Sequence, residues 1–162
     1  GEKSKLPYRE RITMMKQNYF VYAGCYGPAE EAGIHGYRLT RREGREPQLT
    51  EVFAAAGVSN PSYLAVSADG KFLYSVMEDM AYEGREGGGV AAFRIDEGSL
   101  TLLNTQGTAG TLPCHLLPDE KRGFLYATNY LSGSVSMFRL NADGSVGELC
   151  DLKQHYGHGP KE

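Results

Sequence analysis

The sequence predicts an all-β protein that is built from a repeated unit of four short strands. One segment occurs twice in full and its later part occurs a third time near the N-terminus, so that Tyr22, Tyr74 and Tyr126 follow one another at a spacing of 52 residues. Apolar and polar residues alternate with a period of two over short stretches, and no stretch shows a helical stripe. A repeat of roughly 40 to 50 residues with four strands is typical of a β-propeller blade.

Each copy of the repeat predicts its own strands. The first copy predicts three strands and the other two copies predict four each, over residues 19–24, 34–40 and 48–55, then 62–67, 71–77, 88–95 and 99–106, then 114–118, 123–129, 134–140 and 146–153. Asp69-Gly70 and Asp143-Gly144 lie between such strands and are typical of tight hairpin turns.

These strands divide the chain into a partial blade at 19–55, a blade at 60–106, a blade at 112–153 and a connection at 154–162 toward a further blade. Residues 1–17 are expected to form a polar tail, with Met14 or Met15 as an alternative native start.

The first copy lacks the first strand of the repeat. In many propellers the C-terminal end of the chain supplies this strand and closes the ring. A sheet that stays open exposes backbone donors and acceptors at its edges. We therefore expect the chain to be a fragment of a longer protein whose remaining blades cover the edges, with coverage by other copies of the chain as the alternative.

Composition excludes several classes of function. The net charge of −3 is not that of a nucleic-acid-binding protein, and no apolar run is long enough to cross a membrane. Cys25, Cys114 and Cys150 are widely separated and lack CxxC spacing, which predicts reduced thiols in a cytoplasmic protein and neither a disulfide nor a metal site. We expect no cofactor.

The strand order predicts which end of the blades carries function. In a four-stranded meander, the loops between the second and third strands share one end with the connections between blades. This end, called the mouth below, holds the longer and glycine-rich segments at 25–33, 78–88, 107–113, 130–133 and 154–162. Binding residues commonly lie on such loops above a rigid scaffold.

Four stretches in this order resemble the lactonase family of seven-bladed propellers, of the 6-phosphogluconolactonase type. They are Asn60-Pro61-Ser62-Tyr63-Leu64-Ala65-Val66-Ser67, the run at 88–95, Pro113-Cys114-His115 with Ala127-Thr128-Asn129-Tyr130, and the run at 154–160. The resemblance implies about three blades of seven, from the N-terminal portion of an enzyme that hydrolyses a sugar lactone such as 6-phosphogluconolactone.

The chain departs from the family pattern at its end. The family continues after the His-x-Gly-x-Gly-Pro stretch with an Arg-Gln pair and a Pro-His-x-His segment, whereas this sequence ends at Lys161-Glu162. We therefore expect the parent to be active and the 162-residue chain to be inactive alone.

Lactone hydrolysis needs a base for water and a donor for the developing oxyanion. His155, His115 and Glu78 are the candidate catalytic residues, because an imidazole or a carboxylate can accept the proton. Asn129 and Tyr130 are candidate substrate-binding residues.

Arg85 is the candidate for a substrate phosphate. Each candidate has a structural alternative: His115 can hydrogen-bond a buried loop, Glu78 and Asn129 can tie loops to backbone amides, and Arg85 can be a solvated charge. A divalent metal on Glu78, Asn129 and His155 is conceivable by ligand type but is not the prediction.

Two other functions fit the same fold. A propeller can serve as a binding or scaffold module without chemistry, because a fold does not determine a function. A muconate-type lactonizing enzyme, acting on an unsaturated dicarboxylate, is the third hypothesis. It needs several arginines at the mouth, which Arg85 alone does not supply.

Overall fold

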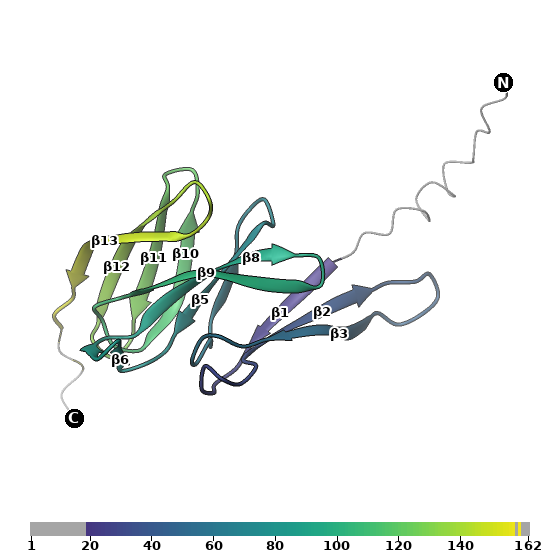
Figure 1. Cartoon of the computed structure of the whole chain (residues 1–162), viewed down its shortest axis with the longest axis horizontal. Coiled ribbons are helices and arrows are strands. Elements are labelled where there is room, and N and C mark those ends of the chain that lie inside the picture. Colours follow the sequence, from purple (N-terminus) through teal and green to yellow (C-terminus); the bar gives the residue numbers. More distant parts are fainter. Residues whose placement is uncertain (1–18, 158, 160–162) are drawn as a thin grey trace, which may run out of the picture.

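The computed structural model describes residues 19–157 and 159, and this part of the chain contains thirteen strands and no helix (Figure 1). The strands are β1 (Tyr19–Gly24), β2 (Ile34–Thr40), β3 (Gln48–Ala55), β4 (Leu64–Val66), β5 (Phe72–Met77), β6 (Ala81–Tyr82), β7 (Arg85–Glu86), β8 (Gly89–Asp96), β9 (Ser99–Gly107), β10 (Pro113–Asp119), β11 (Phe124–Asn129), β12 (Ser134–Leu140) and β13 (Val146–Gln154). The expected tail at 1–17 and part of the connection at 154–162 lie outside the described residues.

Three antiparallel meanders follow one another along the chain, in the orders β1-β2-β3, β4-β5-β8-β9 and β10-β11-β12-β13. They are the first, second and third blades below, and they lie side by side in chain order (Figure 1). The prediction of an all-β fold made of propeller blades is confirmed. A search of the described residues for helices long and apolar enough to cross a membrane finds none.

One element of the fold was not predicted. Residues 78–88 were expected to form a loop at the mouth, but β6 and β7 form a small hairpin within this segment, with Tyr82 paired to Arg85. Glu83 and Gly84 at its tip have φ of 48° and 75°, which is the backbone of a tight hairpin turn. Tyr82 anchors the hairpin to the second blade through a 2.8 Å hydrogen bond between its hydroxyl and that of Thr105.

Two apolar cores hold the blades together, one between each pair of neighbours. Between the first and second blades lie Ile34, Val58, Leu73, Met77, Ala91 and Phe93. Between the second and third blades lie Tyr74, Val76, Val90, Ala92, Leu116, Leu125, Ala127, Phe138 and Val146. Adjacent residues of β5 and β8 belong to different cores, because successive side chains of a strand point to opposite faces.

Burial along the strands follows from this stacking. In β5 and β8 the buried residues form nearly continuous runs, because both faces of the second blade are covered. In β11 and β12 buried residues alternate with partly exposed ones, because only the face toward the second blade is covered. Tyr126 and Met137 lie on the uncovered face and are paired across β11 and β12.

Polar side chains also tie the second blade to the third. Asn104 in β9 accepts a 2.9 Å hydrogen bond from the backbone NH of Val146 and donates a 2.6 Å bond to its carbonyl. The buried Tyr74 hydroxyl donates to the carbonyl of Gly144, at 3.0 Å. These bonds satisfy polar groups inside the interface and set how the two blades sit against each other.

Two prolines enter glycine-lined gaps in the preceding blade. A Cβ at Gly33 would lie 2.8 Å from the ring of Pro61, and a Cβ at Gly88 would lie 2.4 Å from the ring of Pro113. Each proline precedes or begins the innermost strand of its blade, β4 or β10. Because Gly33 and Gly88 have no side chain, the inner strands can approach the preceding blade closely.

Candidate functional site

The repeat places Tyr26, Glu78 and Tyr130 at equivalent positions, just beyond β1, β5 and β11. The backbone NH of Glu78 donates to the carbonyl of Asn60 at 3.1 Å, and that of Tyr130 donates to the carbonyl of Leu112 at 2.9 Å. In the second and third blades, these bonds join the loop after β5 or β11 to the connection that enters the same blade. They bring the two kinds of loop together at the mouth, as the strand order predicts.

Glu78 is the best-held of the predicted catalytic residues. Its Oε2 accepts a 2.8 Å hydrogen bond from the hydroxyl of Tyr26 in the first blade, and another from the hydroxyl of Ser62. The hydrogen bond to Glu78 is the largest of the influences that raise the pKa of Tyr26. The Cys114 thiol makes a smaller contribution in the same direction. A half-buried carboxylate thus lies among hydroxyl groups from two blades.

The neighbouring Asp79 is occupied by the local fold. Its carboxylate accepts hydrogen bonds from the Ser59 hydroxyl and, at 2.6 Å, from the Asn60 side-chain amide. The Asn60 side-chain oxygen in turn accepts a 3.0 Å bond from the NH of Gly27. This network fixes the connection before Pro61, where Asn60 has a φ of 43°. Asp79 therefore acts as a loop anchor in this structure.

His115 lies on β10, the innermost strand of the third blade, and its side chain is exposed. Its ring packs on that of Tyr63, with centroids 4.6 Å apart and planes tilted by 44°. Tyr63 and His115 are repeat-equivalent, so the repeat brings matching positions of neighbouring blades into contact near the inner strands. No hydrogen bond joins His115 to Glu78 among the residues described.

Asn129 lies inside the third blade and is fully buried. Its amide nitrogen donates to the hydroxyls of Ser134 at 3.0 Å and Ser136 at 2.9 Å, and the Ser136 hydroxyl donates to the carbonyl of Thr108. The side-chain oxygen of Asn129 is buried and has no hydrogen-bond partner among the residues that the structure describes. The amide thus ties together a strand and the connection from the second blade, and its role in substrate binding stays a prediction.

The other three predicted residues are exposed. Tyr130 has 74% of its surface accessible, Arg85 lies in the β6–β7 hairpin, and His155 follows β13. The backbone NH of His155 donates to the carbonyl of Gly133 at 2.9 Å. Within residues 19–157 and 159, no hydrogen bond, ion pair or ring contact joins these side chains to Glu78 or His115. The same residues contain no group of three potential metal ligands.

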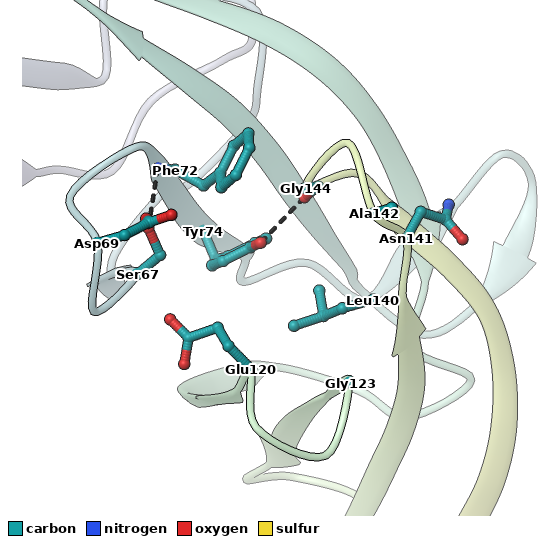
Figure 2. A pocket seen from close by; sticks show the side chains of 10 residues that line it. All are labelled: Ser67, Asp69, Phe72, Tyr74, Glu120, Gly123, Leu140, Asn141, Ala142 and Gly144. Atoms are coloured by element: carbon teal, nitrogen blue, oxygen red, sulfur yellow. Dashed lines mark hydrogen bonds between the residues drawn. The ribbon is translucent and has the colours of Figure 1, made fainter.

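A cleft of about 270 Å³, whose lining is drawn in Figure 2, is formed by the turns opposite the mouth. Its lining comes from the turns at that end and consists of Ser67, Asp69, Phe72, Tyr74, Glu120, Gly123, Leu140, Asn141, Ala142 and Gly144. Asp69 accepts from the Ser67 hydroxyl and Glu120 accepts from the NH of Ala68. The charged groups of this cleft are carboxylates that hydrogen-bond within turns. They would repel an anionic substrate, so the cleft is poorly suited to bind one.

Tyr26 and Ser62 were not among the predicted site residues. The signal was present, because Tyr26, Glu78 and Tyr130 have the same 52-residue spacing as the strand tyrosines. Repeat-equivalent residues lie at the same level along neighbouring blades, so a long side chain of one blade can contact its equivalent in the next. The hydrogen bond between Tyr26 and Glu78 is such a contact.

Stacked antiparallel meanders, two of them with four strands, define this chain as part of a β-propeller. The family model described as "Lactonase, 7-bladed beta-propeller" matches residues 20–162, and the chain belongs to that family. It is 36% identical over 147 residues to a 6-phosphogluconolactonase of Bacillus subtilis, covering 89% of this chain and 40% of that protein. A 6-phosphogluconolactonase of Formosa agariphila is 33% identical over 129 residues, covering 78% of this chain and 35% of the relative.

Solved structures show the same architecture. A Bacteroides fragilis protein proposed to be a 6-phosphogluconolactonase matches with a TM-score of 0.78 and 33% identity, over 92% of this chain and 40% of that one. A periplasmic gluconolactonase of Pseudomonas aeruginosa matches with a TM-score of 0.71 and 26% identity, over 85% of this chain and 39% of that one. The chain therefore spans about two fifths of the proteins it matches.

Proposed function

We propose that this chain forms part of a lactonase that hydrolyses a sugar lactone such as 6-phosphogluconolactone. The observation that carries the proposal is the Glu78 carboxylate at the mouth, held by hydroxyl groups of two blades in a chain of the lactonase family. A fixed carboxylate at a loop-lined end is suited to accept a proton from water. The named relatives are lactonases of this substrate class.

The roles of the individual residues follow from the chemistry of ester hydrolysis. Glu78, His115 or His155 takes the proton of the attacking water, and a second of them donates to the oxygen that develops negative charge. Asn129 and Tyr130 bind substrate hydroxyls or a ring face, and Arg85 pairs with the phosphate. The reaction needs no metal or organic cofactor in this scheme.

The proposal extends to the surroundings of the chain. Further blades of the same protein cover the outer face of the third blade and the edge of β1, with other copies of the chain as the alternative cover. The three widely spaced cysteines, unpaired in this structure, favour the cytoplasm. Fractionation of cells that express the protein tests this placement.

The direct test assays the product of the full reading frame that encodes this chain on 6-phosphogluconolactone. His115→Ala, His155→Ala and Glu78→Gln are compared with His35→Ala, a histidine of β2 whose ring is hydrogen-bonded to Glu51. Loss of the base is expected to lower kcat by roughly 10²- to 10⁴-fold, and His35→Ala to leave it unchanged. We expect residues 1–162 alone to show no turnover.

Each outcome has a clear meaning. A variant with unchanged turnover removes its residue from the mechanism. An unaltered protein that binds the lactone without hydrolysing it contradicts the enzyme hypothesis and supports a binding module. Turnover of an unsaturated dicarboxylate in place of the sugar lactone supports the lactonizing alternative.

A further inference from the structure

The Glu78 carboxylate is held at one of its two oxygens only. The Tyr26 and Ser62 hydroxyls both donate to Oε2, and no described residue donates to Oε1. An ionised carboxylate has about four lone-pair sites, so acceptor capacity is left on Oε1. The half-buried side chain keeps this oxygen within reach of the solvent at the mouth.

The two donors come from different blades, and this determines what they can do. Ser62 belongs to the segment that enters the second blade, whereas Tyr26 reaches Glu78 from the end of the first blade. One hydroxyl leaves a carboxylate free to rotate about that bond, but two on the same oxygen restrict it. Hydrogen bonds to an ionised acceptor are also stronger than neutral ones. The orientation of Glu78 therefore depends on the packing between the first two blades.

We propose that Tyr26 is a positioning residue for Glu78 in the lactone-opening reaction. This inference rests on the proposed function and assigns the proton to a particular atom. Oε1 of Glu78 takes a proton from water while the water oxygen bonds to the carbonyl carbon of the lactone. The ring C–O bond then breaks, and the released ring oxygen takes the proton as a hydroxyl. The sum of the steps is the addition of one water.

The ionisation of Tyr26 reports on this contact without any enzyme assay. Its pKa is raised first by the hydrogen bond to Glu78, then by desolvation and by the negative charge of Glu78, with a small contribution from Cys114; the Ser62 hydroxyl acts in the opposite direction. Glu78→Gln should therefore lower the pKa of Tyr26 toward 10, and Ser62→Ala should raise it further. NMR titration of the chain with ¹³C-labelled tyrosine, assigned with Tyr26→Phe, measures both shifts.

The kinetic test uses the product of the full reading frame. Tyr26→Phe removes the donor and keeps the ring, and is expected to lower kcat about tenfold with KM changed less than about twofold. A fall in kcat at nearly constant KM is the mark of a positioning role, because a general loss of the folded mouth would change both parameters. Tyr37→Phe, in β2 of the same blade, is the matched control and should retain wild-type kcat.

The outcomes separate the two proposals. No turnover in the unaltered protein overturns the proposed function, and this inference with it. Turnover that is unchanged by Tyr26→Phe overturns only the positioning role. A Tyr26 pKa that does not respond to Glu78→Gln also overturns it, because the hydrogen bond would then be absent in solution.

Discussion

Tyr74 shows how one side chain contributes to a blade interface. Its ring is 1% exposed in the core between the second and third blades, and its hydroxyl donates to the carbonyl of Gly144. Tyr74→Phe removes this bond and leaves a buried carbonyl without its partner. We expect a loss of about 1 kcal/mol in the free energy of unfolding, measured by urea denaturation.

Tyr126 supplies the matched control for that substitution. It occupies the equivalent position in the third blade, but no hydrogen bond to its hydroxyl is found among the described residues. Tyr126→Phe should change stability by less than about 0.5 kcal/mol. Equal losses in the two variants would contradict the assigned role of the Tyr74 hydroxyl.

Tyr74 also makes the free energy of unfolding depend on pH. Burial, with smaller effects of nearby carboxylates, raises the pKa of Tyr74 to about 12 from an ordinary value of 10.0. The stabilisation is complete below about pH 10 and is lost as pH rises toward 12, because the unfolded chain releases the proton first. Tyr74→Phe should show a shallower fall of stability over this range.

At the scale of the element, the approach of neighbouring blades depends on glycine. A Cβ at Gly88 would lie 2.4 Å from Cδ of Pro113 and 2.5 Å from the carbonyl oxygen of Met77. Gly88→Ala must displace the backbone of β10 or β5, so we expect a loss of about 1 to 3 kcal/mol in unfolding free energy. Thermal and urea denaturation measure this loss.

Gly157→Ala is the control for the glycine substitution. No atom of the described residues lies within 4 Å of a Cβ at that position, and its φ is not positive. Its stability should match that of the wild type. If Gly88→Ala is equally well tolerated, the inner strands do not pack as closely as described.

Elements differ in how well the sequence predicts them. Strands β5 and β8 were predicted within a residue or two, because their apolar runs are bounded by turn residues. The β6–β7 hairpin was missed, since its strands have two residues each and its turn, Glu83-Gly84, is not among the dipeptides typical of hairpins. The hairpin is held by a tertiary contact: the ring of Tyr82 packs over Gly107, where it would lie within 3.5 Å of an added Cβ.

At the scale of the whole molecule, the outer face of the third blade has the character of an interface. Tyr126 and Met137 on this face correspond to Tyr74 and Ala92 in the second blade, which are buried against the third. Leu117, paired with Tyr126, is 56% exposed. Exposed apolar faces of this kind promote association.

We therefore expect the 162-residue chain to associate reversibly as its concentration rises. Leu117→Glu places a charge on the face and should weaken the association, as measured by sedimentation velocity. Leu131→Glu is the control, because Leu131 is 55% exposed but lies on a loop beyond β11. A chain that stays monomeric at all concentrations, or equal effects of the two variants, would contradict this prediction.

The sequence by itself determined the blade architecture, the positions of the blade strands and the end of the blades where the longer loops meet. Both the period of alternation and the 52-residue spacing are properties of the residue order along the chain, so they can be recognised without knowing how the sheets pack. Only the tertiary structure decided which candidates meet: Tyr26 and Ser62 hold Glu78, His115 packs on Tyr63, and Asn129 is buried. Contacts across blades depend on how two sheets pack, and no pattern within one repeat encodes that distance.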